Sequence, residues 1–303
     1  MFAARKLGVM GDMLLELELT GRCQLRCRHC YADSGPSGTD GAMTANDWQR
    51  VIADAADLGV GMVQFIGGEP SLHSAFRQLV AQAINAGLRV EVFSNLVHVT
   101  KACWDLYSHP RVSLATSYYS DTAAEHQAVT GRRGSHARTR ANIAEAVRRK
   151  IPIRAGIIDV VAGQRVEQAR AELQAMGVPR IGIDRLRGVG RGAGGGGRPS
   201  MVELCGRCGH RCAAITPNGD VLPCALARWM QVGSVRQQPL GEILDGPAWR
   251  ACVATIPGPH AAACFPDQCS PDVGGCNPSN EGPDCYPAER PACNPAYPEP
   301  KPR

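Results

Sequence analysis

The chain has 303 residues, of which 44% are hydrophobic, and its 33 basic and 28 acidic side chains give a net charge of +5. This length suits one large domain or one domain with a smaller companion. The mild positive charge gives no argument for nucleic acid as a partner. Residues 1–13 lack the apolar core and the cleavage site of a signal peptide, and no apolar run approaches the length of a membrane span. We therefore expect a cytoplasmic protein without a membrane partner.

The first two thirds of the chain alternate strand-like and helix-like patterns. Residues 13–20 alternate with period two, and residues 43–59 place apolar side chains at helical spacing behind Thr44 as N-cap. Such alternation predicts an α/β fold with a parallel sheet and outer helices, in which the site lies at the carboxyl ends of the strands. Further strands are predicted at 61–68, 88–95, 112–117, 151–160 and 179–186, and further helices at 72–87, 137–150 and 166–177.

The composition changes after residue 187. The glycine-rich stretch GVGRGAGGGGRPS at 188–200 predicts a linker without regular structure. Beyond it proline and cysteine become frequent, and one short helix is expected within 239–256. The last segment is too poor in aliphatic residues to order itself without metal or cluster ligation. The predicted division is a tail at 1–12, an α/β domain at 13–187, a linker at 188–200 and a cysteine-rich domain at 201–303.

Fourteen cysteines in a chain without an export signal favour metal or iron–sulfur ligation over disulfides. Cys103 stands alone, and we expect it to be a small core residue. Cys23, Cys27 and Cys30 have the spacing C-x3-C-x2-C and directly follow the first strand, where a site is expected. A closed zinc site normally has four ligands, so three soft thiolates suit a [4Fe–4S] cluster with one open iron. The alternative is a zinc site completed by His29 or by a remote cysteine.

A second motif, FIGGEP at 65–70, ends the next strand of the predicted sheet. Gly67 and Gly68 have no side chain to obstruct a ligand that approaches the backbone. Glu69 places a carboxylate at the mouth of the sheet, where it can accept hydrogen bonds from an ammonium group. The two motifs together are more specific than either alone.

At these residues the sequence resembles the radical S-adenosylmethionine (SAM) superfamily, over roughly residues 13–190. TGRCQLRCRHCYA is similar to that family's cluster loop, and GGEP to its motif for the methionine amino group. The resemblance implies a partial (β/α)6 barrel whose cluster is completed by SAM and cleaves it to a 5′-deoxyadenosyl radical, which abstracts hydrogen from a substrate. The cofactor-binding residues that it implies, besides the cluster ligands Cys23, Cys27 and Cys30, are His29, Gly67, Gly68, Glu69, Ser94, Asn95 and Ser117.

The stretch LCGRCGHRCAAITPNGDVLPC at 204–224 carries four more cysteines. Asn218-Gly219 predicts a β-hairpin that brings Cys208 and Cys224 together. The pattern resembles the auxiliary-cluster extension called SPASM or its shorter form, twitch, but the usual later C-x2-C-x5-C-x3-C run is absent. One or two auxiliary clusters, a zinc site and a disulfide-bonded or free-thiol tail therefore stay open. The candidate ligands are Cys205, Cys208, Cys212, Cys224, Cys252, Cys264, Cys269, Cys276 and Cys285.

Three hypotheses follow. The first is an enzyme that oxidises or crosslinks a ribosomally made precursor peptide, supplied with electrons by a reductase, flavodoxin or ferredoxin. Because the barrel begins near residue 13, we expect a separate protein to recognise the leader peptide. The second is a radical enzyme that oxidises, epimerises or decarboxylates a small metabolite. The third is a non-catalytic iron–sulfur or zinc protein, against which Glu69 and the open cluster site argue. Tyr118, Tyr119 and His126 are unranked candidates for a general base.

Overall fold

The computed structural model describes residues 11–194 and 199–258. Its strands form one sheet in the order β6-β5-β4-β3-β2-β1-β7-β8-β9, in which β1 to β7 run parallel and β8 and β9 are antiparallel additions. The strands are β1 Leu14–Glu18, β2 Met62–Ile66, β3 Arg89–Phe93, β4 Val112–Tyr118, β5 Ile153–Asp159, β6 Arg180–Arg185, β7 Cys212–Ile215, β8 Asp220–Leu222 and β9 Gly233–Ser234.

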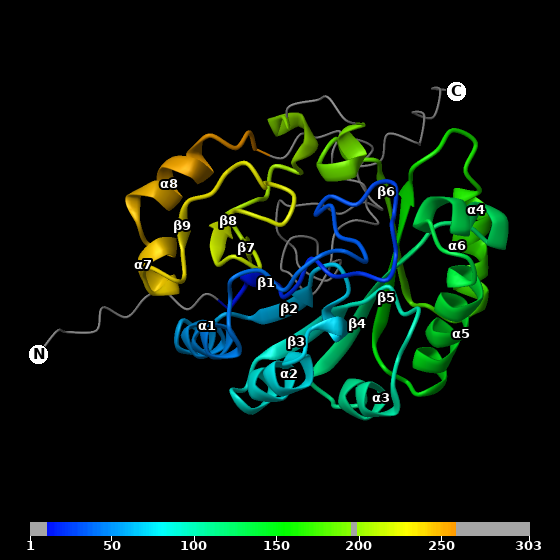
Figure 1. The fold of residues 1–303 in the computed structure, drawn as a ribbon, viewed down its shortest axis with the longest axis horizontal. Helices are drawn as coiled ribbons and strands as arrows, with labels where there is room; N and C mark the ends of the chain where they lie inside the picture. The colour runs from blue at the N-terminus through cyan, green and yellow to red at the C-terminus, as the bar shows by residue number, and fades with distance from the viewer. Residues whose placement is uncertain (1–10, 195–198, 259–303) are drawn as a thin grey trace, which may run out of the picture.

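Helices cover the outer face of this curved sheet (Figure 1). Thr44 begins the first of them with a capping box, because its hydroxyl accepts from Asp47 N and its own N–H donates to Asp47 Oδ2 at 2.8 Å. No helix in the described part of the chain is long and apolar enough to cross a membrane. The helices are α1 Ala45–Asp57, α2 Phe76–Asn85, α3 Lys101–Tyr107, α4 Ala123–Thr130, α5 Ser135–Arg148, α6 Val166–Ala175, α7 Leu240–Leu244 and α8 Pro247–Ala254, with short 3-10 turns η1 Pro70–Leu72, η2 Gly190–Ala193 and η3 Met201–Glu203.

The hydrophobic core lies between the sheet and the outer helices. Leu17 on β1, Phe65 on β2 and Leu114 on β4 are fully buried against helix residues such as Trp48 and Phe76. Burial of such side chains is the main force that holds the helices on the sheet. Cys103 is buried in this core, as predicted.

Helices α3 and α4 were not predicted from the sequence pattern. Helix α4 buries His126 and Thr130 together with Val129, so its inner face is largely polar. Apolar periodicity, on which the prediction depends, is therefore weak in this segment. Both helices lie in connections that follow strands, and they complete the predicted strand–helix alternation.

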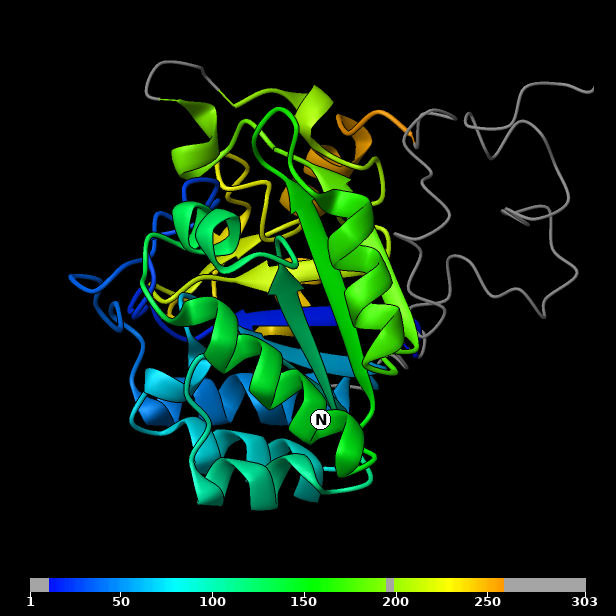
Figure 2. The same ribbon diagram turned by 90° about the vertical axis from the view of Figure 1, so that its right-hand side faces the viewer.

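The cysteine-rich region extends the sheet of the barrel. Leu14 on β1 is in register with Cys212 on β7, and Gly219 at φ 90° turns the predicted hairpin between β7 and β8. Leu240 N, at the start of α7, donates to Asp54 Oδ2 on α1 at 3.2 Å. Figure 2 shows these yellow and orange segments beside the dark blue β1. The described part of this region therefore shares its sheet and its core with the barrel.

The glycine-rich segment after β6 differs from its prediction. Its described residues include the 3-10 turn η2, so the expectation that it holds no regular structure is wrong there. Gly190 has φ 57°, and a Cβ at this position would lie 2.4 Å from the carbonyl oxygens of Cys30 and Tyr31. Glycine is therefore needed here for close packing against the loop that carries the first three cysteines.

Candidate active site and auxiliary cysteine site

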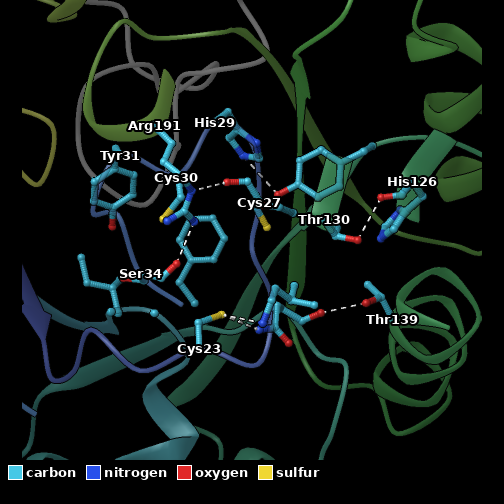
Figure 3. Close-up of a pocket in the computed structure, with 18 residues that line it drawn as sticks. Cys23, Cys27, His29, Cys30, Tyr31, Ser34, His126, Thr130, Thr139 and Arg191 are labelled. Carbon is cyan, nitrogen blue, oxygen red and sulfur yellow. Dashed lines mark hydrogen bonds between the residues drawn. The ribbon is translucent and has the colours of Figure 1, made fainter. Parts of the chain in front are cut away.

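The three N-terminal cysteines line one cavity at the carboxyl ends of the strands. This cavity has a volume of about 120 Å³, and Figure 3 shows the cysteines around it. The loop that carries them, residues 20–35, follows β1 and is called the cluster loop below. Of the other residues predicted to bind the cofactor, the structure places His29, Gly67, Gly68, Asn95 and Ser117 in the cavity wall.

The cluster loop is held mainly through its backbone. Cys23 N donates to Gly35 O at 3.0 Å, which closes the loop on itself. Arg26 N and Arg28 N donate to carbonyl oxygens of α4, at 2.9 Å each. These contacts fix a segment without regular structure, so that its thiols face one space.

The two glycines of the GGEP motif pack against the cluster loop. A Cβ on Gly67, whose φ is 147°, would lie 2.5 Å from Thr20 O, and one on Gly68 would lie 2.3 Å from Arg22 O. Gly68 N also donates to Thr20 O at 2.7 Å. The glycines line the cavity as expected, but the close approach that requires them is to protein backbone.

Glu69 lies behind the cavity wall, and this differs from the expectation that its carboxylate waits at the mouth. It is fully buried and accepts hydrogen bonds from Ser71 Oγ at 2.7 Å, Ser94 Oγ at 3.0 Å and Asn95 N at 2.9 Å. Burial raises the pKa of Glu69, and these hydrogen bonds act in the opposite direction. Ser94 therefore contacts Glu69 and does not line the cavity itself.

Asn95 joins this buried carboxylate to the cluster loop. Its Nδ2 lies 3.6 Å from Cys23 Sγ, and its Oδ1 accepts from Gln24 Nε2 at 3.0 Å. Thr139 Oγ1 on α5 donates to Asn95 O at 2.9 Å. The cluster loop thus fixes the Asn95 side chain beside the first cysteine, and α5 fixes its backbone carbonyl.

The opposite wall carries aromatic and imidazole rings. Tyr119 Oη lies 3.3 Å from His29 Nε2, and its ring centroid is 5.1 Å from that of His29 and 5.3 Å from that of His126. Burial lowers the pKa of His29 to about 4 and that of His126 to about 3, so both rings are neutral near pH 7. Tyr119 and His126 line the cavity, whereas Tyr118 does not.

Three buried polar atoms of residues in this wall have no hydrogen-bond partner within the described protein: His29 Nδ1, Ser34 Oγ and His126 Nδ1. Buried polar atoms in native proteins are normally satisfied. A polar ligand in this cavity would supply the missing partners. Soft thiolates suit iron–sulfur ligation, so the donor set and the orphaned atoms fit a cluster with a polar cosubstrate.

A second cavity, of about 460 Å³, lies between the cluster loop and the hairpin cysteines. It shares His29, Tyr31, Ile66, Phe93 and Ser117 with the first cavity. The two cavities therefore have a common wall, and the second also has four cysteines in its lining, Cys205, Cys208, Cys212 and Cys224.

The four hairpin-region thiols differ in their surroundings. Cys208 Sγ lies 2.8 Å from Cys224 Sγ, which confirms the predicted approach of these two residues. The Cys212 thiol donates to Glu16 Oε2 at 3.3 Å, and burial raises the pKa of both groups. A hydrogen bond from Cys208 lowers the pKa of Cys205 to about 6, and the charges of nearby arginines act in the same direction.

The other candidate ligands are less well placed or not described. Cys252 on α8 is partly buried against the small apolar cluster that includes Cys208, but it does not line the second cavity. Cys264, Cys269, Cys276 and Cys285 lie outside the described residues.

Comparison with known protein families shows which family the chain belongs to. The sequence profile of the radical SAM superfamily matches residues 17–175, which is over half of the chain. The chain belongs to the radical SAM superfamily. A second profile, SPASM, an iron–sulfur cluster-binding domain, matches residues 200–270. These matches confirm the predicted fold class and imply a [4Fe–4S] cluster, SAM and auxiliary iron–sulfur clusters as cofactors.

The names of similar proteins indicate different substrates. A probable GTP 3′,8-cyclase of Methanothermobacter thermautotrophicus is 36% identical over 77 residues, 25% of this chain and 25% of that enzyme. The chain thus spans a quarter of that relative's length. A PqqA peptide cyclase of Xanthomonas campestris is 25% identical over 86% of this chain and 80% of its own. SuiB of Streptococcus suis, solved with SAM and with precursor peptide SuiA, shares the fold at 15–16% identity, with TM-score 0.67 over 80% of this chain and 66–68% of SuiB.

The sequence patterns did not indicate three residues that line one or both cavities, Arg191, Tyr31 and Glu16. Tyr31 follows the third cysteine directly, so its position in the motif is a usable signal. Arg191 and Glu16 carry no such signal, because they meet the site only through tertiary contacts.

Proposed function

We propose that this protein is a radical SAM enzyme that oxidises or crosslinks a ribosomally made precursor peptide. Cys23, Cys27 and Cys30 would hold a [4Fe–4S] cluster, and SAM would bind beside it in the same cavity. The observation that carries the proposal is the common wall between the thiol-lined cofactor cavity and the larger cavity that ends at four further cysteines. A substrate group in the larger cavity lies next to both cysteine sites.

The bound cofactors supply an electron that splits SAM and yields a radical, which takes a hydrogen atom from the substrate. The chain itself binds and orients the nucleotide. His29, Asn95 and Ser117 offer polar groups from the cavity wall, and Glu69 keeps the Asn95 loop in place. The buried wall also excludes water from the reacting groups.

The larger cavity suits an apolar or aromatic side chain of a peptide that also carries a carboxylate close to that side chain. Its wall includes Leu14, Ile66, Phe93, Ile158 and Leu226, and a cavity of about 460 Å³ accommodates a side chain with its flanking backbone. The same lining contains four arginines and two carboxylates, and Arg185 and Arg187 already form ion pairs with Glu203 and Asp184, whereas Arg211 forms none among the described residues. The peptide class is supported by the similarity to a PqqA peptide cyclase and to SuiB, which has been solved with its precursor peptide.

The hairpin cysteines would hold the electron acceptor that the last step of product formation needs. When a substrate radical closes to a crosslink or an unsaturated product, it loses one further electron and a proton. Cys205, Cys208, Cys212 and Cys224 line the far side of the cavity and would hold an auxiliary cluster that takes this electron. Cys252 and the cysteines beyond residue 258 are proposed as further ligands, in one cluster or two.

We further propose two protein partners. One is an electron donor of the flavodoxin, ferredoxin or reductase class, which would supply the electron that the chemistry needs. A separate recognition protein binds the leader of the precursor peptide. Co-purification with the products of neighbouring genes tests both partners.

The test begins with anaerobically reconstituted, reduced full-length protein and SAM. Release of 5′-deoxyadenosine is expected, and it is abolished in Cys23→Ala/Cys27→Ala/Cys30→Ala but retained in the matched control Cys103→Ala, whose thiol lies in the core. A non-catalytic iron–sulfur protein would bind iron and release no 5′-deoxyadenosine.

A second assay identifies the substrate class. A synthetic precursor peptide encoded beside the gene is expected to lose the mass of two hydrogens in a reaction that depends on SAM. Robust 5′-deoxyadenosine release with no change in any neighbouring peptide would favour the small-molecule alternative, which the similarity to a probable GTP cyclase supports.

A further inference from the structure

Arg191 reaches the cluster loop from the far end of the barrel. Its Nε donates to Cys27 O at 2.8 Å and its Nη2 to Ser34 O at 2.7 Å, while its backbone N–H donates to Cys30 O at 3.0 Å. Figure 3 shows the side chain above the three cysteines. One residue therefore holds the carbonyl groups of two of the three cysteines.

The segment around Arg191 is shaped for this contact. Gly190 adopts φ 57° where any Cβ would collide with the backbone of Cys30 and Tyr31, and Val189 beside it is buried. A left-handed glycine and a buried valine set the direction of the following side chain. The contact thus depends on the fold of the segment as well as on the flexible arginine side chain.

The guanidinium brings a positive charge to the cofactor cavity. Arg191 lines that cavity and is half-buried, and within the described residues it has no carboxylate partner. The acceptors of its side chain are the carbonyl oxygens of Cys27 and Ser34, which leave its net charge in place. The positive charge of Arg191 therefore lies in the wall of the same cavity as the three thiols.

We propose that Arg191 is a positioning residue for the N-terminal cluster that also keeps a permanent positive charge beside its three thiolates. This inference rests on the proposed function, in which these thiolates hold a cluster. Reduction adds one negative charge to the cluster, and a nearby positive charge stabilises the reduced state relative to the oxidised one. The two hydrogen bonds that the Arg191 side chain donates keep the cluster loop in the shape that the three-cysteine site requires.

Three variants separate charge from shape. Arg191→Lys keeps the charge and loses the planar two-pronged contact, whereas Arg191→Met loses both. Arg132→Met is the matched control, because Arg132 Nη1 donates to Gln24 O on the same loop at 2.9 Å but does not line the cavity. Full-length reconstituted proteins are titrated with a graded reductant without substrate, and the N-terminal cluster is followed by the electron paramagnetic resonance signal that responds to added SAM.

At a fixed potential, Arg191→Met is expected to lower the ratio of reduced to oxidised N-terminal cluster about tenfold, which is about 59 mV for a one-electron couple. Arg191→Lys should stay within about twofold of the wild type in this ratio, and Arg132→Met should not change it. Both Arg191 variants should lose iron to a chelator faster than Arg132→Met does, because the loop has lost its clamp.

A wild-type potential in Arg191→Met would overturn the charge effect, as would an equal shift in Arg191→Lys and Arg191→Met. If the two Arg191 variants lose iron no faster than Arg132→Met, the positioning role is wrong. Iron loss can also be measured on a variant that is too unstable for the reductant titration. A wild-type protein that binds no N-terminal cluster contradicts the proposed function itself, which distinguishes the two failures.

Discussion

The backbone N–H of Asn95 donates a 2.9 Å hydrogen bond to Glu69 Oε2, and the Asn95 side chain lies 3.6 Å from Cys23 Sγ. This relationship joins the GGEP motif after β2, the loop after β3 and the cluster loop after β1. The buried carboxylate therefore acts on the site through the loop that it anchors. A motif residue that does not face the cavity can still decide the shape of the cavity wall.

Replacement of Glu69 by glutamine tests this anchor. The amide nitrogen would replace an acceptor where Ser94 Oγ and Asn95 N donate, so buried donors would face each other. We expect a loss of about 1–3 kcal/mol in the free energy of unfolding and weaker binding of SAM. Urea denaturation and equilibrium dialysis measure the two effects. Glu167→Gln, on the exposed face of α6, is the control and should change neither.

Features that depend on neighbouring residues were predictable from the sequence. Thr44 with Asp47 three residues later forms a capping box, and Asn218-Gly219 forms the hairpin that brings Cys208 to Cys224. The cluster loop was predictable for the same reason, because its three cysteines lie within eight residues of the chain.

Features that depend on distant contacts were not predictable. Arg191 meets Cys27 across 164 positions of the chain, and a glycine-rich composition gives no indication of a clamp. Glu69 was placed at the cavity mouth because its strand end is there, but Ser94 and Asn95, some 25 residues later, satisfy its carboxylate behind the wall. A pattern shows which strand ends gather at the site, but tertiary contacts decide which side chains face it.

Replacement of Cys208 by alanine tests the auxiliary site. Its sulfur is close to that of Cys224 and its residue lines the second cavity, so loss of this thiol should remove a cluster ligand. We expect iron content to fall by about four atoms per chain. Release of 5′-deoxyadenosine should continue, because the cluster loop is intact. The core variant Cys103→Ala should keep the full iron content, and an unchanged iron count in Cys208→Ala would exclude this residue as a ligand.

Charge reversal at Arg211 tests the substrate cavity. Arg211 is exposed at the cavity and directly precedes Cys212, and it has no ion-pair partner among the described residues. If the peptide presents a carboxylate here, Arg211→Glu should raise KM for the peptide about tenfold, since attraction is replaced by repulsion. Uncoupled release of 5′-deoxyadenosine should not change. Arg77→Glu, on the exposed outside of α2, carries the same charge change and should leave KM as it is. An equal KM for both variants would argue against a carboxylate at this position.

His126 gives the protein without cofactors a defined sensitivity to acid. Burial lowers its pKa to about 3 from a usual 6.5, so between these values the unfolded chain binds a proton that the folded chain does not. Folding stability must then decrease as pH falls below about 6.5, and this one group contributes a slope of about 1.4 kcal/mol per pH unit.

His126→Phe keeps a ring against Tyr118 and Tyr119 but cannot titrate, so the free energy of unfolding of this variant should fall less steeply over the same pH range. The exposed His98→Phe is the control and should follow the wild type. Chemical denaturation at several pH values measures the slopes, and parallel curves for wild type and His126→Phe would show that this imidazole is protonated as readily in the folded protein as in the unfolded chain.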